Sequence, residues 1–128
     1  MVKKVLIPLL GALALTLVTT PALADWAQVI GADELQTLYT NKTFRGTAWI
    51  GYYCADGRGV VRVAGENNPR TWRVEGDDQV CIDSLGDVTC YTYERNDKKQ
   101  DEYRAIRVDD HQKVVMKIED KVPEMCGS

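Results

Sequence analysis

The side chains that could do nucleophilic or acid–base chemistry are few in this 128-residue chain, which has a single histidine, His111. Any Ser-His-Asp or Cys-His arrangement would have to use that imidazole. His111 lies in the polar segment Asp109-Asp110-His111-Gln112, which is typical of a turn and carries no nucleophile motif. The same segment offers too few ligands to hold a divalent metal ion by itself. We therefore predict no catalytic residue, no metal site and no cofactor.

Paired carboxyl groups are a second source of chemistry. Adjacent aspartates occur at Asp77-Asp78 and at Asp109-Asp110, and both pairs lie between strand candidates, where aspartate is an ordinary turn residue. Glycosidase-type catalysis needs two carboxyl groups that face each other across a cleft. Because a sequence does not show such convergence, a small hydrolase that uses paired carboxylates is kept as an alternative.

The four cysteines are Cys54, Cys81, Cys90 and Cys126. An even number of cysteines in an exported chain indicates disulfides, and the absence of a C-x-x-C motif argues against a thioredoxin-type dithiol. A hairpin whose turn is centred on Leu85-Gly86 sets Cys81 opposite Cys90, within reach of a disulfide. We predict the pairs Cys81–Cys90 and Cys54–Cys126, the second of which ties the C-terminal tail to the first long strand.

The large aromatic side chains are mostly tyrosine and tryptophan, with 6 Tyr and 3 Trp against 1 Phe. Such rings often lie at a boundary, where they line a ligand cavity or form a contact patch. Period-two alternation places Trp49 and Tyr53 on one face with Arg45, and places Tyr91 and Tyr93 together on another strand. We predict a contact surface formed by Arg45, Trp49, Tyr53, Tyr91 and Tyr93. The alternative is that these rings fill the core of a small antiparallel fold.

The first 24 residues have the pattern of a targeting segment. Lys3 and Lys4 precede the apolar run Val5–Val18, and Ala22-Leu23-Ala24 forms a small-x-small cleavage site. We predict a signal peptide over residues 1–24, a single small domain over residues 25–128, and a periplasmic or secreted location.

The remaining chain holds 14 basic against 19 acidic residues. That acidic balance argues against a general nucleic-acid binder, and we expect no stable membrane insertion after cleavage.

The elements that position these side chains are mainly strands. One helix is predicted over Ala32–Tyr39, because Leu35 and Leu38 form an apolar stripe and Asp33-Glu34 suit a helix N-terminus. Turn signals then recur every 8 to 14 residues and separate about seven strands. The strands are predicted at Thr43–Cys54, Val60–Val63, Arg70–Glu75, the hairpin around Cys81 and Cys90, Glu102–Val108 and Lys113–Glu119. The fold class is all-β, an antiparallel meander that curls into a small barrel or half-barrel after one short helix.

Four stretches carry a resemblance to small exported proteobacterial proteins of a domain family of unknown function. They are ADELQTLYTNKTFRG, WIGYYCADGRG, RTWRVEGDDQVC and CYTYER, and together they cover about Gly31 to Tyr93. The resemblance implies a lipocalin-like or half-barrel shape and an exported location, without an activity. The YYCADG stretch is also similar to the Tyr-x-Cys signature of membrane-bound inhibitors of C-type lysozymes. The chain has no counterpart that we can place for the serine- and glycine-containing loop of those inhibitors.

These observations favour a non-enzymatic binding or interaction module of the cell envelope. We expect its partner to be an envelope protein or a small apolar ligand, and not a nucleic acid. The alternatives are a periplasmic inhibitor of a lysozyme-type enzyme and the small hydrolase described above.

Overall fold

The computed structural model describes residues 25–127, so the predicted signal peptide lies outside the described residues. The described chain is mainly β structure with one α-helix. Its elements are β1 (Trp26–Val29), α2 (Ala32–Tyr39), β2 (Lys42–Arg45), β3 (Trp49–Tyr53), β4 (Arg58–Val63), β5 (Glu66–Glu75), β6 (Gln79–Ser84), β7 (Asp87–Asn96), β8 (Glu102–Arg107), β9 (Lys113–Glu119) and the 3-10 helix η3 (Glu124–Cys126). Neither of these helices has the length and apolar composition that a membrane-spanning helix needs.

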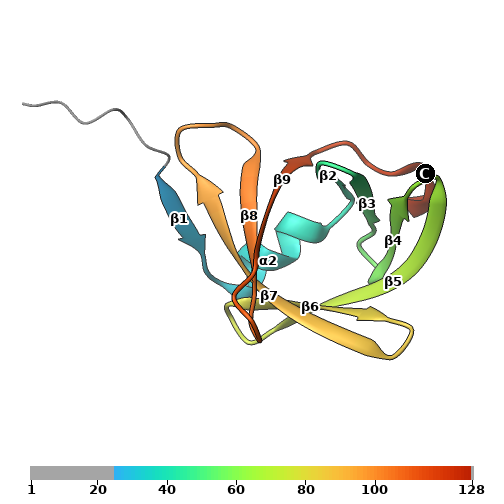
Figure 1. Ribbon diagram of the computed structural model, residues 1–128, viewed down its shortest axis with the longest axis horizontal. Coiled ribbons are helices and arrows are strands. Elements are labelled where there is room, and N and C mark those ends of the chain that lie inside the picture. The colour runs from blue at the N-terminus through green and yellow to red at the C-terminus, as the bar shows by residue number, and fades with distance from the viewer. Residues whose placement is uncertain (1–24, 128) are drawn as a thin grey trace, which may run out of the picture.

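The strands form an up-and-down barrel. Each strand from β2 to β9 pairs antiparallel with its successor, and β9 pairs with β2, which closes an eight-stranded ring. In the view of Figure 1, α2 overlaps the middle of the ring of strands. The predicted all-β meander is therefore confirmed, and its closed form removes the free edges that an open sheet of this size would expose.

The long strand β7 has three partners. Its first half pairs with β6, with Cys81 opposite Cys90, and its second half pairs with β8 on the other edge. Beyond the end of β6, the short strand β1 takes the vacant edge and pairs Val29 with Tyr93. Strand β1 was not predicted, because its pairing partner lies more than sixty residues away in the sequence.

One strand boundary differs from the prediction. The segment Thr43–Cys54 is a hairpin and not a single strand, since β2 ends at Arg45 and the chain reverses before Trp49. The amide of Gly46 donates to the carbonyl of Trp49 at 2.9 Å to close the turn. A Cβ at Gly46 would lie 2.1 Å from the Trp49 indole, so a glycine is required where the ring covers the turn. The reversal explains why the barrel has eight strands where about seven were predicted.

The second boundary that differs is around Pro69. The segment between the predicted strands Val60–Val63 and Arg70–Glu75 belongs mostly to β5. The reversal is a two-residue turn at Ala64 and Gly65, both with positive φ. Pairing with β6 reaches only Thr71, so one edge of β5 is free at Pro69. A proline is tolerated there because no β6 residue needs its missing amide.

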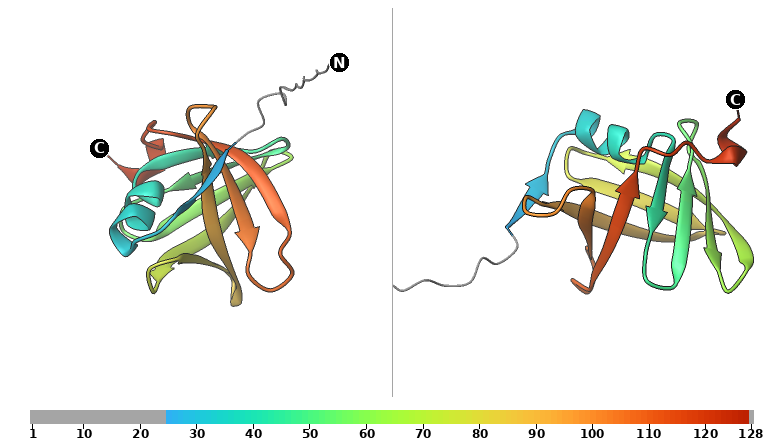
Figure 2. Two further views of the ribbon diagram at one scale, coloured as in Figure 1. Left: turned by 90° about the vertical axis from the view of Figure 1, so that its left-hand side faces the viewer. Right: turned by 90° about the horizontal axis from the view of Figure 1, so that it is seen from above.

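Helix α2 has the predicted bounds and lies at one end of the strands (Figure 2). Its buried side chains are Leu35, Leu38 and Tyr39, which pack into the core. The amide of Gly31, just before the helix, donates to the carbonyl of Asp77 in the β5–β6 turn at 2.6 Å. An isolated helix of this length is unstable in water, so its packing across the barrel end holds it in place.

Both predicted disulfides are present. Cys54–Cys126 joins the end of β3 to η3 across a sequence separation of 72, and Cys81–Cys90 links β6 to β7 across a separation of 9. The hairpin turn is centred on Leu85 and Gly86, as its register predicted. Two disulfides in so small a domain are typical of an oxidising, extracytoplasmic environment.

Candidate functional site

The barrel interior contains a cavity of about 240 Å³. Helix α2 closes one end of the barrel and forms the floor of this cavity, which opens toward the other end. Inward-facing side chains from all eight barrel strands, β2 to β9, and from α2 line the cavity. They are Tyr39, Phe44, Trp49, Tyr53, Val61, Arg70, Ile82, Tyr91, Tyr93, Ala105, Val114 and Met116. An eight-stranded barrel has an interior that side chains can fill or that can hold one small ligand. Here the rings fill only the closed end.

The floor of the cavity is an aromatic cluster around Tyr39. The ring of Tyr39 lies with its centroid 4.7 Å from Phe44, 4.7 Å from Tyr53 and 5.2 Å from Trp72. All three pairs are tilted or edge-on, and none is a face-to-face sandwich, which aromatic pairs disfavour. The helix thus supplies the central ring of a floor whose other rings come from the barrel wall.

The hydroxyl groups of this floor stay protonated. The hydroxyls of Tyr39 and Tyr93 hydrogen-bond to each other. Burial raises the pKa of Tyr39 and of Tyr93, and the proximity of the Tyr93 hydroxyl raises the pKa of Tyr39 further. Burial also raises the pKa of Tyr53, while the Arg70 guanidinium acts in the opposite direction. The floor therefore offers neutral donors and no negative charge.

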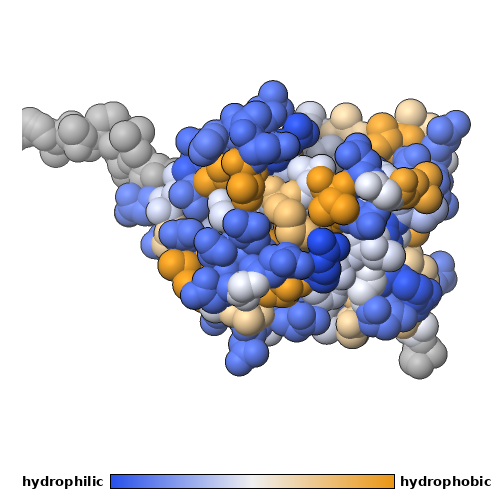
Figure 3. Space-filling view, turned by 90° about the horizontal axis from the view of Figure 1, so that it is seen from below, coloured by the Kyte–Doolittle hydropathy of each residue, from blue (hydrophilic) through white to orange (hydrophobic). Residues whose placement is uncertain are grey.

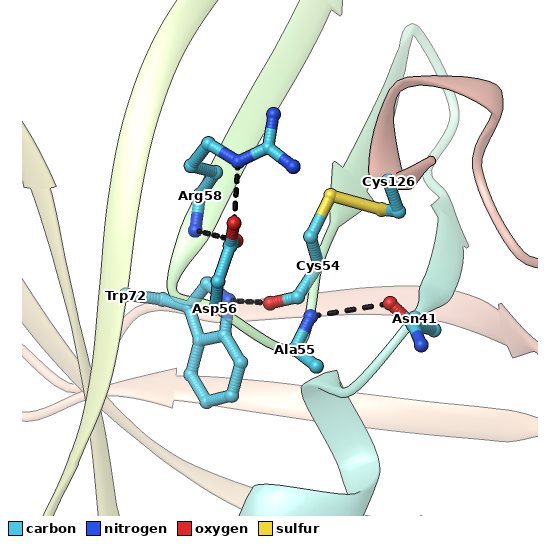
Figure 4. Close-up of polar contacts among 7 residues, drawn as sticks. All are labelled: Asn41, Cys54, Ala55, Asp56, Arg58, Trp72 and Cys126. Carbon is cyan, nitrogen blue, oxygen red and sulfur yellow. Dashed lines mark hydrogen bonds and ion pairs between the residues drawn. A yellow bond between two sulfur atoms is a disulfide. The ribbon is translucent and has the colours of Figure 1, made fainter. Parts of the chain in front are cut away.

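The turn between β3 and β4 anchors the floor from outside the cavity (Figure 4). The Trp72 indole donates to the Cys54 carbonyl at 2.9 Å, and the Ala55 amide donates to the Asn41 side chain at 3.1 Å. In the same turn, both the amide and the guanidinium of Arg58 donate to the Asp56 carboxylate. Together with the Cys54–Cys126 disulfide, these contacts fix the ends of the strands that carry Tyr53 and Trp72.

The opposite end of the barrel is open and has an apolar rim. Val63 pairs with Trp49 and Val114 pairs with Ala105, which places both valines on the inward face. Their exposed fractions are nevertheless 45% and 37%, because no element covers this end. Leu85, at the tip of the β6–β7 turn on the same end, is 88% exposed. The rim thus gives access to the cavity across apolar side chains.

The predicted contact residues divide between two faces. Trp49, Tyr53, Tyr91 and Tyr93 all line the cavity. Arg45 lies on the outer face, where its guanidinium contacts Glu119 at 3.0 Å, because the chain reversal after β2 changes which alternate residues point inward. The structure therefore brings the four rings together inside the barrel and excludes Arg45 from them.

Arg70 is the charged residue of the cavity lining, and it was not predicted from the sequence. It lies on β5 opposite Gly59 and two residues before Trp72, so the alternation of β5 turns it inward with that ring. The available signal in the sequence was the alternation along this strand, because Arg70 falls on the same face as Trp72 and Val74. Among residues 25–127, Arg70 forms no ion pair, and the one hydrogen bond of its side chain goes to the neighbouring Pro69 carbonyl.

The residues considered for catalysis are not gathered. His111 is exposed in the β8–β9 turn at the open end, and Asp110 beside it pairs with Arg107. Asp77 and Asp78 lie in the β5–β6 turn at the helix end of the barrel. The two aspartate pairs are thus at opposite ends and do not converge across a cleft. Within the described part of the chain, no three His, Cys, Asp or Glu side chains are grouped as metal ligands.

A second concave region lies on the outer face, between β2–β4 and the C-terminal tail. This groove has a volume of about 630 Å³ and carries the basic residues Arg45, Arg62 and Lys121 beside Tyr52. The Cys54–Cys126 disulfide holds the tail that forms one of its walls. The groove is larger than the cavity, but its apolar lining comes from the exposed tail and the exposed strand surface and not from buried side chains.

Comparison of the chain with protein-family models, with curated proteins and with solved structures gives no match.

Proposed function

We propose that this protein is a non-enzymatic, lipocalin-like binding module, periplasmic or secreted, whose barrel takes up one small and mainly apolar ligand. The observation that carries the proposal is the ring-lined cavity with its apolar, uncovered rim. Concave sites lined by hydrophobic and aromatic side chains with a few polar groups are the usual form of a small-molecule site. The two disulfides suit an exported protein of this size.

The cavity volume limits the ligand. At about 240 Å³ the space is smaller than the roughly 300–1,000 Å³ of drug-sized pockets. It corresponds to about eight water molecules at about 30 Å³ each. A single ring or a short alkyl chain suits this volume, whereas a long-chain lipid would leave most of its chain outside.

The outer wall supports a protein contact less well than the interior supports a ligand. On the face drawn in Figure 3, hydrophobic residues form separate small islands between hydrophilic ones. Large contiguous apolar patches are the usual mark of a stable protein contact surface. The rings predicted for such a surface are instead turned into the barrel.

The test uses the purified protein with both disulfides formed, titrated with 1-octanol and with indole while thermal stability and tryptophan fluorescence are followed. Val114→Trp places a large ring at the mouth of the cavity, and Val115→Trp places the same ring one residue away on the outer face. We expect binding by the unaltered protein and by Val115→Trp, and a loss of at least tenfold in affinity in Val114→Trp. Equal affinities in the two variants, or no binding of either probe, would exclude the barrel as the site.

The outer groove supports a second candidate, contact with an acidic protein of the envelope. The exposed guanidinium of Arg62 has no ion-pair partner among residues 25–127, and Arg45 and Lys121 line the same groove. A pull-down from periplasmic extract compares Arg62→Glu with Arg73→Glu, a change on another strand outside the groove. A partner lost only with Arg62→Glu supports this candidate, and a partner retained by both variants rules out the groove.

A further inference from the structure

A guanidinium lines a cavity whose other lining residues are all uncharged, and folding alone does not account for it. The neighbouring inward positions carry Val61 and Ile82, which lower the free energy of the folded state by burying apolar area. Arginine at such a position loses part of its hydration, and an unpaired charge that is removed from water destabilises the fold. Arg70 is half-buried and, among the described residues, has no carboxylate partner.

The donors of Arg70 are available to a ligand. A guanidinium has five N–H donors, and the structure uses one of them, which binds the Pro69 carbonyl at 3.0 Å. Tyr53 lines the same cavity as Arg70, and burial keeps its hydroxyl protonated by raising its pKa. A positive fork and a neutral hydroxyl donor therefore face the same space.

We propose that the ligand is a small amphipathic anion, a carboxylate with one ring or a short alkyl chain, and that Arg70 selects it by binding the carboxylate. This inference rests on the proposed function and names its ligand class. The planar fork of arginine matches a carboxylate with two parallel hydrogen bonds. The rings of the floor hold the apolar part, and the carboxylate replaces the partner that the folded chain does not supply to Arg70.

Binding of such an anion offsets the loss of hydration of the unpaired Arg70 guanidinium in the free protein. In a partly dry cavity a charged hydrogen-bonded pair is stronger than in water, and the approaching carboxylate meets no negative charge on the floor. An uncharged ligand of the same shape, such as an alcohol, gains the apolar contacts and at most a weaker hydrogen bond from Arg70 to a neutral oxygen. Arg70 is thus a specificity-determining residue, and its removal acts much more on the acid than on the neutral analogue.

The experiment compares octanoate with 1-octanol, two chains of equal length that differ in the anionic group. Dissociation constants are measured at pH 7.5 by titration calorimetry for the unaltered protein, Arg70→Met and Arg70→Lys. We expect octanoate to bind the unaltered protein at least tenfold more tightly than 1-octanol. Arg70→Met should abolish that preference by lowering the affinity for octanoate much more than the affinity for 1-octanol, and Arg70→Lys should restore part of the preference. The tenfold expectation follows from the contribution of a hydrogen bond to a charged group.

The outcomes separate the two proposals. Absence of binding by both probes contradicts the proposed function itself. Equal binding of the two probes, or an acid preference that survives Arg70→Met, overturns the inference and leaves the apolar cavity as a site. A parallel fall in both affinities in Arg70→Met, with Arg70→Lys unable to restore the acid preference, assigns Arg70 a purely structural role and also overturns it. Circular dichroism and thermal melting of each variant establish that the barrel is retained.

Discussion

The hydroxyl of Tyr39 on α2 and the hydroxyl of Tyr93 on β7 hydrogen-bond to each other inside the barrel, although 54 residues separate them in the sequence. Both side chains are almost completely buried. Each hydroxyl is therefore the partner of the other in a region that offers little access to water. This bond attaches the helix to the wall that it closes and makes the floor of the cavity dependent on one polar contact.

The first prediction concerns this pair. Tyr39→Phe or Tyr93→Phe leaves the remaining hydroxyl buried without its partner, and we expect each to lower the free energy of unfolding by about 1–3 kcal/mol. The double variant should cost clearly less than the two single variants together, because no orphaned hydroxyl remains. Urea unfolding of the four proteins gives the coupling. Strict additivity of the two changes would show that the hydroxyls do not depend on each other.

The second prediction is a loss of stability at alkaline pH. Burial raises the pKa of Tyr39, Tyr53 and Tyr93 above the ordinary value near 10 that the unfolded chain has. Below pH 10 these tyrosines are protonated in both the folded and the unfolded chain, and their contribution to the free energy of unfolding is fully present. As the pH rises above 10, the unfolded chain releases protons that the folded chain keeps, so stability falls, by up to about 1.4 kcal/mol per pH unit for each such tyrosine.

Urea midpoints between pH 7 and pH 11 measure this effect. Tyr53→Phe removes one of the three groups, and we expect the decline above pH 10 to be shallower in that variant. Tyr52→Phe is the matched control, since Tyr52 is the adjacent residue on the outer face of the same strand. An equally steep decline in the unaltered protein and in Tyr53→Phe would contradict the assignment.

The elements that the sequence predicted correctly are those whose signals are local. The spacing of Leu35 and Leu38 gave the helix, and the alternation around Leu85-Gly86 gave the hairpin register that places Cys81 opposite Cys90. The two disulfides followed from that register and from the even number of cysteines. Such signals need only neighbouring residues to be interpreted.

The features that were missed depend on residues far apart. The reversal at Gly46 has no Asn-Gly or Asp-Gly signal, and its glycine is explained only by the Trp49 ring above it. Missing that turn placed Arg45 on the face of Trp49 and Tyr53. The cavity itself arises because β9 closes on β2, and no local pattern shows which inward residues then face each other. Arg70 could be placed on an inward face by parity, but its lack of a partner is visible only in the closed barrel.

The third prediction tests the glycine of the β2–β3 turn. Gly46→Ala places a methyl group within 2.1 Å of the Trp49 indole, so the ring must move. We expect a loss of about 1–3 kcal/mol, in the range of overpacked substitutions, and a shifted tryptophan emission. Gly65→Asn is the control, because nothing lies within 4 Å of a Cβ at Gly65 and asparagine tolerates positive φ. An unchanged emission spectrum and midpoint in Gly46→Ala would show that the ring does not cover the turn.

The last prediction compares the two disulfides. Loss of Cys54–Cys126 frees the C-terminal tail and opens a loop of 72 residues, whereas loss of Cys81–Cys90 opens a loop of 9 in a hairpin that the sheet still holds. Chain-entropy arguments give about 4 kcal/mol for the longer loop and about 3 kcal/mol for the shorter one, as upper values. We therefore expect Cys54→Ala/Cys126→Ala to lower the unfolding midpoint more than Cys81→Ala/Cys90→Ala.

The two double variants also differ in where they loosen the molecule. Without Cys54–Cys126, amide exchange should rise in η3 and in the β3–β4 turn, where the Cys54 carbonyl accepts the Trp72 indole bond that anchors the floor. Without Cys81–Cys90, the rise should be confined to the tip of the β6–β7 hairpin around Leu85. Hydrogen-exchange mass spectrometry resolves the two regions. A larger destabilisation from the hairpin disulfide would mean that the strand pairing of β6 and β7 depends on its covalent link, and that the tail contributes little to the anchoring of the floor.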